Sequence, residues 1–156
     1  MKTEIKTSLL LMLSMSLMSS MCSDDDDNQQ TNNSQTIQQI TTQVQSGNWE
    51  VTYFFDTDQE ETENFNGYTF SFETNNQLTA TNGSNTYIGS WSVTDSNSSD
   101  DSQEDVDFNI NFTSPPNFEE LSDDWDIISH SSTKIELIDI SGGNGGTDYL
   151  TFEKLQ

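Results

Sequence analysis

The chain has 156 residues, and its formal charge of −23 comes from 27 acidic residues against four lysines and no arginine. Once a leader and a polar stretch are subtracted, this length leaves room for one domain of roughly 110 residues. A surface this acidic repels phosphate backbones, whose binding proteins need clustered lysine and arginine, so nucleic acid is excluded as a partner. The nine Phe, four Tyr and three Trp residues argue against disorder, because they can form an aromatic core.

Residues 1–21 have the features of a signal peptide. Lys2 and Lys6 precede an apolar run over residues 9–18 that is too short to span a bilayer, and small residues follow it. Cys22 is the only cysteine, so it cannot form an internal disulfide, and lipidation accounts for an unpaired exported thiol. The mature chain is expected to begin at Cys22 and to hold 26 acidic and two basic residues.

The residues after the cysteine are Ser23, Asp24, Asp25, Asp26 and Asp27. The segment from Cys22 to Asp27 resembles the start of mature Bacteroidetes-type surface lipoproteins, in which a serine and acidic residues after the lipidated cysteine act as an export signal. The resemblance implies that the chain is attached to the outer membrane by a lipid on Cys22 and is exposed at the cell surface.

The next segment changes from polar sequence to helical periodicity. Residues 28–34 have no large apolar residue, so residues 22–35 are predicted to be the lipidated cysteine and a flexible acidic and polar tether. Ile37, Ile40 and Val44 stand at spacings of three and four, and a glycine follows, which predicts an amphipathic helix over residues 36–46. The folded domain is predicted to span residues 36–156.

From residue 49 onward the apolar residues recur with a period of two, which is typical of strands with one buried and one solvated face. In the first strand this alternation places Trp49, Val51, Tyr53 and Phe55 on the inner face. The pattern predicts eight strands, over residues 49–56, 68–73, 77–81, 86–93, 106–113, 125–130, 133–140 and 148–155.

The succession of eight predicted strands along the chain indicates an all-β fold. No segment after residue 48 offers a long helix for a βαβ crossover, so a parallel sheet is excluded. A short helical turn is expected after Pro115 and Pro116, with Phe118 and Leu121 pointing inward. An antiparallel meander of about eight strands has two exposed edges, which closure removes, so we predict a small up-and-down barrel with a short N-terminal helix.

A short motif supports this fold. Gly47-Asn48-Trp49 is a G-x-W sequence at the entrance to the first strand, preceded by the predicted helix. It resembles the opening signature of lipocalins and lipocalin-like lipoprotein domains. Lipocalins pack a late arginine against that tryptophan, and in this chain Lys154 is the late cation available. The resemblance implies a barrel that Trp49 closes at its base and that holds a small apolar molecule.

Catalytic and metal chemistry find little support, so the protein is predicted not to be an enzyme. With Cys22 assigned to a lipid, Cys-His catalysis is excluded, and His130 is interpreted as a solvated residue at a strand end. Paired carboxylates could hydrolyse glycosides, but 26 acidic side chains single out no pair. The acidic loops lack the glycine and terminal glutamate of an EF-hand, so weak, diffuse cation binding is expected, with no dedicated metal and no cofactor.

The inner aromatic side chains are the remaining candidate for a function. An eight-stranded barrel is near the size at which one small ligand fits inside, although the same rings could simply fill the core. The candidate ligand-binding residues are Trp49, Tyr53, Phe70, Trp91, Phe108 and Trp125.

Two functions follow. The leading hypothesis is a monomeric, lipid-anchored, non-catalytic module at the cell surface that binds a small hydrophobic ligand or a partner protein. The alternative is a structural or adhesive acidic surface lipoprotein with a solid barrel and weak cation binding.

Overall fold

The computed structural model describes residues 27–95, 106–141 and 146–156. Its elements, in chain order, are the helix α1 (Asp27–Gln45), the strands β1 (Asn48–Asp56) and β2 (Gln59–Glu60), the 3-10 turn η1 (Thr62–Phe65), the strands β3 (Thr69–Phe72), β4 (Gln77–Thr81), β5 (Thr86–Asp95) and β6 (Val106–Asn111), the short helix α2 (Pro116–Glu119), and the strands β7 (Asp123–His130), β8 (Lys134–Ile140) and β9 (Thr147–Lys154). None of the helices in this described part is both long and apolar enough to cross a membrane.

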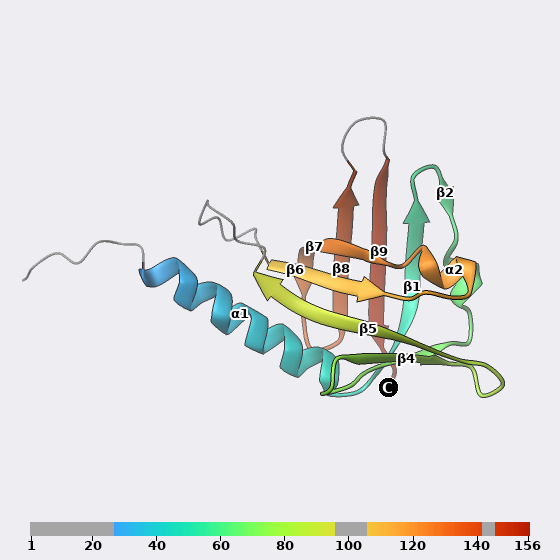
Figure 1. Cartoon of the computed structure of the whole chain (residues 1–156), viewed down its shortest axis with the longest axis horizontal. Helices are drawn as coiled ribbons and strands as arrows, with labels where there is room; N and C mark the ends of the chain where they lie inside the picture. The colour runs from blue at the N-terminus through green and yellow to red at the C-terminus, as the bar shows by residue number, and fades with distance from the viewer. Residues whose placement is uncertain (1–26, 96–105, 142–145) are drawn as a thin grey trace, which may run out of the picture.

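The strands form one antiparallel sheet that closes on itself (Figure 1). Strands β3 to β9 pair in sequence order, and β1 pairs with β3 on one side and with β9 on the other. Eight strands therefore form a closed barrel, and β2 adds a short ribbon to the end of β1. Closure pairs both edges of the meander, so the predicted up-and-down antiparallel barrel is confirmed.

All eight predicted strands are present, with ends that differ from the prediction by no more than two residues. The predicted helical turn is α2, and both Phe118 and Leu121 are fully buried. Two short elements, β2 and η1, were not predicted, because residues 57–67 contain no alternating apolar run.

The first strand departs from strict alternation. A β-bulge between Val51 and Tyr53 shifts the pairing of β1 with β9 by one residue. An extra residue on one strand moves every later side chain to the opposite face. Phe54 is consequently buried, whereas Tyr53 is 40% exposed on the outside. The prediction that Tyr53 points into the barrel is therefore wrong, and its assignment to an interior ligand site has to be corrected.

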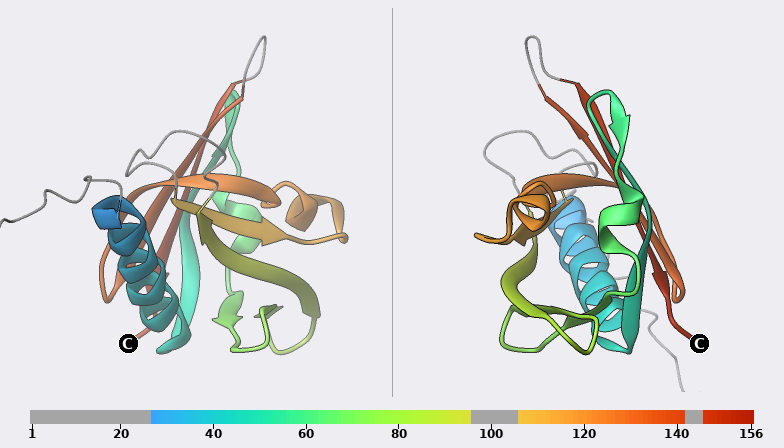
Figure 2. Two further views of the ribbon diagram at one scale, coloured as in Figure 1. Left: turned by 60° about the vertical axis from the view of Figure 1, so that its left-hand side comes forward. Right: turned by 90° about the vertical axis from the view of Figure 1, so that its right-hand side faces the viewer.

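Helix α1 packs across one end of the barrel, between its walls (Figure 2). Ile40 and Val44 are fully buried there, as their spacing predicted. The helix begins at Asp27, nine residues before the predicted start, so residues 27–35 are helical and do not form the predicted flexible tether. The extension was not predicted, because the helix was predicted from apolar spacing and residues 28–34 contain no large apolar residue. A polar contact fixes it to the barrel instead, because buried Asn33 donates its side-chain N–H to Asp95 Oδ2 at the end of β5, at 3.2 Å.

The G-x-W segment completes the closure of this end. Trp49 is fully buried, and its indole N–H donates to the carbonyl oxygen of Val44 at 2.8 Å. Lys154 Nζ lies 5.6 Å from the centre of the Trp49 ring and donates to Ser46 Oγ at 2.7 Å. A Cβ atom at Gly47 would lie 2.5 Å from Lys154 Cε, so the glycine leaves room for the lysine to reach the ring. Lys154 thus takes the place predicted for the late cation.

Candidate functional site

The predicted anchor lies mostly outside the described residues. Cys22, Ser23 and the aspartates 24–26 precede the part of the chain that the structure describes, and Asp27 is the first residue of α1. The lipid attachment, the export signal and the signal peptide therefore stay predictions.

Five of the six candidate ligand-binding residues form part of the core. Their exposed fractions are 0% for Trp49, 0% for Phe70, 4% for Trp91, 0% for Phe108 and 1% for Trp125. All three indole N–H groups already have acceptors: Trp91 donates to the Glu73 carbonyl and Trp125 to the Leu121 carbonyl, each at 3.1 Å, and Trp49 donates to Val44. The structure brings these residues together, but their polar atoms are committed to the fold.

Aromatic rings meet across the inside of the barrel. The Phe72 ring on β3 lies 5.6 Å, centre to centre, from Phe108 on β6 and 5.5 Å from Phe152 on β9. These three strands are not neighbours in the sheet, so their side chains touch across the space that a ligand would need. The edge-to-face angles, 86° and 82°, are those that aromatic pairs favour. The middle of the barrel is therefore filled by its own side chains.

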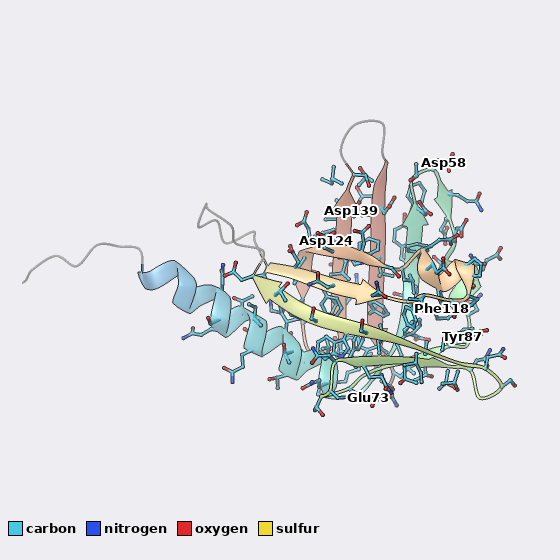
Figure 3. The ribbon with its side chains drawn as sticks, in the orientation of Figure 1. Asp58, Glu73, Tyr87, Phe118, Asp124 and Asp139 are labelled. Carbon is cyan, nitrogen blue, oxygen red and sulfur yellow. The ribbon has the colours of Figure 1, made fainter. Side chains whose placement is uncertain are left out.

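Phe118 of α2 closes the end of the barrel opposite α1. Its ring is fully buried, and its neighbours include Phe65 at 5.3 Å, Tyr87 at 4.8 Å and Phe112 at 5.3 Å between centres. Figure 3 shows Phe118 and Tyr87 near each other on this side of the molecule. Sequence patterning predicted that Phe118 points inward, but not that it inserts among rings from several elements.

Three carboxylates gather at the same end of the barrel, on strands β7, β8 and β9. Asp123, Asp139 and Asp148 continue the inward-facing positions of Trp125, Leu137 and Leu150, and one oxygen of each lies within 4.8 Å of the others. We call these three residues the carboxylate cluster. Of the three, Figure 3 labels Asp139, on β8.

The environment of the cluster disfavours a full set of negative charges. Burial is the main cause that raises the pKa of Asp123 from 3.8 to about 6, followed by a hydrogen bond with the Asp124 side chain and by the charge of Asp139. Asp148 Oδ1 accepts the backbone N–H of Thr57 at 2.6 Å. Three oxygens at this spacing suit part of the shell of a hard cation, but acidic groups also gather without one. The cluster alone therefore identifies no ligand.

An open groove of about 340 Å³ lies across β5, β6 and the start of β7. Its polar lining comprises Ser90, Asn109, Asn111, Ser122, Asp123 and Asp124. Several of these groups are used within the protein: Asn109 Nδ2 donates to Thr94 Oγ1 at 2.9 Å, and Ser122 Oγ bonds both the N–H and the carbonyl of Phe112. The groove thus differs from the predicted apolar interior site in both place and chemistry.

Apolar side chains lie on the outside of the barrel, and the bulge in β1 places those of β1 there. Phe55 of β1 pairs with Tyr149 of β9, which pairs on its other side with Ile138 of β8. We call Phe55, Tyr149 and Ile138 the outer apolar row. Tyr53 and Ile140 lie diagonally next to it and are 40% and 65% exposed, and Tyr149 is 37% exposed. Only the pairing register reveals this row, because its members are far apart in sequence.

His130 has a structural role. Its Nδ1 lies 2.9 Å from Gln43 Oε1, so the hydrogen bond links the end of β7 to α1. The prediction of a strand-end histidine is confirmed in position, and the contact explains why a polar ring sits at this junction.

No family model matches this chain, and no curated protein matches it either. One solved structure is similar in fold, the crystal structure of a DUF4847 family protein from Bacteroides vulgatus ATCC 8482. The two chains are 18% identical, with a TM-score of 0.44, and the match covers 72% of this chain and 96% of the other.

Proposed function

We propose that this chain is a non-catalytic binding protein, held on the outer membrane by a lipid on Cys22, and that it binds a partner protein on the outside of its barrel. The observation that carries the proposal is a filled interior combined with an exposed apolar row. Such rows on soluble proteins are typical of interaction sites. The signal-peptide pattern and the Cys22–Asp27 segment support the location.

The packing disfavours the other occupant, a small apolar ligand inside the barrel. To enter, a ligand would have to displace rings such as Phe72 or Phe118, which touch aromatic neighbours on several sides. Removing a buried Phe costs a fold about 3–5 kcal/mol, and a ligand would have to recover this before gaining any affinity. A titration with fatty acids, followed by tryptophan fluorescence, should therefore show no saturable change.

A solid barrel also fits the alternative, a structural or adhesive surface lipoprotein. The two functions differ in whether the outside of the barrel recognises one specific partner. Solubilised in a mild detergent, the full-length lipoprotein should migrate on a native gel as a complex with one other protein. Migration at its own mass alone would exclude the binding function and leave the structural one.

The location is tested separately by protease treatment of intact cells. Cys22→Ala should abolish acylation. Replacing the aspartates 24–26 by alanine should keep the lipid but protect the domain from protease, because the export signal is lost. Equal cleavage of this variant and the wild type would contradict the export signal.

A further inference from the structure

The outer apolar row differs from the rest of the barrel exterior. Outward positions on β4, β5 and β6 are mostly polar, as Thr79, Ser92 and Asn109 illustrate. The outward positions of β1, β9 and β8 instead bring Phe55, Tyr149 and Ile138 into one cross-strand line. We call this face of β1, β9 and β8 the outer wall. Its apolar side chains form one continuous group, whereas the exposed Ile88 and Ile128 lie on β5 and β7, outside this wall.

The fold does not need these side chains for its core. On the same strands the inward side chains of Leu137, Leu150 and Phe152 are at most 1% exposed and fill the interior. Cross-strand pairs on an outer face contribute little to stability, and threonine pairs can supply the same contribution. The exposure of Tyr53, Tyr149 and Ile140 therefore calls for a reason other than stability.

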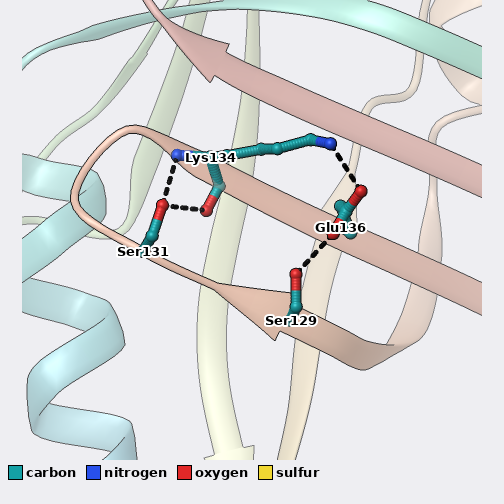
Figure 4. A network of polar contacts seen from close by, with 4 residues as sticks. All are labelled: Ser129, Ser131, Lys134 and Glu136. Carbon is teal, nitrogen blue, oxygen red and sulfur yellow. Dashed lines mark hydrogen bonds and ion pairs between the residues drawn. The ribbon is translucent and has the colours of Figure 1, made fainter.

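Carboxylates lie at both ends of the row. On one side Phe55 pairs with Glu60 of β2, and on the other Ile138 pairs with Asp126 of β7. The one lysine on this wall adds no free positive charge, because Lys134 Nζ lies 2.6 Å from Glu136 Oε1. The other carboxylate oxygen, Glu136 Oε2, accepts the Ser129 hydroxyl (Figure 4). This ion pair lowers the pKa of Glu136 and raises that of Lys134.

The carboxylates at the ends of the outer apolar row indicate which kind of molecule can bind to the outer wall. A second copy of this chain would bring the same carboxylates against themselves, and anionic lipid headgroups would be repelled. A protein surface with an apolar centre and lysine or arginine around it would match both the outer apolar row and the carboxylates at its ends. An apolar contact within a polar border is a common arrangement at protein interfaces.

We propose that the outer wall is the docking surface of this protein, and that it binds a partner protein through an apolar segment flanked by basic residues. This inference rests on the proposed binding function and names the surface and chemistry of its partner. Tyr53, Tyr149 and Ile138 form the centre of the contact, and Glu60 and Asp126 face the partner's cations.

Site-specific photo-crosslinking of the full-length protein in intact cells tests the surface. The probe is benzoylphenylalanine at position 53, and the control carries it at position 88, because Ile88 is 62% exposed but isolated on β5 opposite Thr79. Position 53 should give one adduct with a second protein, and position 88 should give none. The crosslinked segment, identified by mass spectrometry, should contain apolar residues flanked by lysine or arginine.

Two matched charge substitutions test how much the outer wall contributes to binding of the partner protein. Tyr149→Asp should reduce the position-53 adduct by about tenfold or more, the loss expected when a central contact is removed, whereas Ile88→Asp should leave it unchanged. Equal thermal melting of the two variants controls for folding.

Each other outcome overturns the inference. An adduct at twice the mass of the chain identifies a second copy, and an adduct with lipid identifies a membrane contact. A strong adduct at position 88 with none at position 53 places the surface elsewhere and leaves the binding function intact. A native complex on gels with no adduct at either position has the same meaning, whereas the absence of any complex contradicts the proposed function itself.

Discussion

Replacing Asp123 by asparagine should stabilise the fold at neutral pH but not at acidic pH. The pKa of Asp123 is raised from 3.8 to about 6, chiefly because the group is partly buried. Since the folded-state pKa lies above the unfolded one, the folded protein binds this proton more tightly, and ionisation of Asp123 destabilises it. The stability that protonated Asp123 contributes is intact below about pH 4 and is lost as the pH rises through 6.

The size of the effect follows from the two pKa values. The interval from 3.8 to about 6 corresponds to roughly 3 kcal/mol at 1.36 kcal/mol per pH unit, and solvent screening of this partly exposed group reduces it to about 1 kcal/mol. Asparagine keeps the oxygen that accepts the Asp124 backbone N–H at 2.9 Å. Thermal melts from pH 4 to pH 8 should show the variant gaining about 4 °C over the wild type near pH 7 and almost nothing at pH 4.

A charge-matched control separates this local effect from general repulsion. Glu50→Gln also removes one negative charge, but from an exposed outward position near the α1 end of the barrel. It should gain less at pH 7. If Asp123→Asn gains the same at pH 4 as at pH 7, or no more than Glu50→Gln, the raised pKa of Asp123 does not limit the stability of the fold at neutral pH.

Three further expectations test the packing and the charge. Phe118→Ala should cost about 3–5 kcal/mol in a denaturant melt, because it removes the ring that closes one end, while exposed Ile88→Ala should stay within about 0.5 kcal/mol of the wild type. A chain that starts at residue 36 should fold less stably than one that starts at residue 27, because it loses the contact of Asn33 with Asp95; equal denaturation midpoints would contradict this. Sodium chloride should raise the melting temperature, since ions screen self-repulsion beyond about 8 Å at physiological ionic strength; a temperature independent of salt would show that the net charge is not limiting.

The sequence was most informative where one physical pattern dominated. Alternation of apolar and polar residues located all eight barrel strands, and the spacing of Ile37, Ile40 and Val44 located the buried face of α1. Alternation failed at Tyr53, because a bulge is a single inserted residue with no signature in composition. The helical spacing of apolar residues missed the first turns of α1, where buried Asn33 makes a polar contact in place of an apolar one.

The candidate site was harder to predict, because it depends on which strands are neighbours. The outer apolar row joins residues 55, 138 and 149, and nothing in their local sequence relates them. The carboxylate cluster forms because three strands each carry an aspartate where their inward alternation reaches the barrel end. Whether the interior is empty or filled depends on how rings such as Phe72 interlock across the barrel, which alternation does not specify.

The early start of α1 changes how the barrel would sit above a membrane. A helix of 19 residues is about 28 Å long at 1.5 Å per residue, and from Asn33 to its C-terminus it is fixed against the barrel. Four residues lie between Cys22 and Asp27, and an extended chain covers at most about 18 Å over these five residue steps. With a lipid on Cys22, the helix would act as a stalk that limits both the height of the domain and its freedom to rotate. One side of the barrel would then be presented outward more often than the others, and the length of α1 would set which partners can reach it.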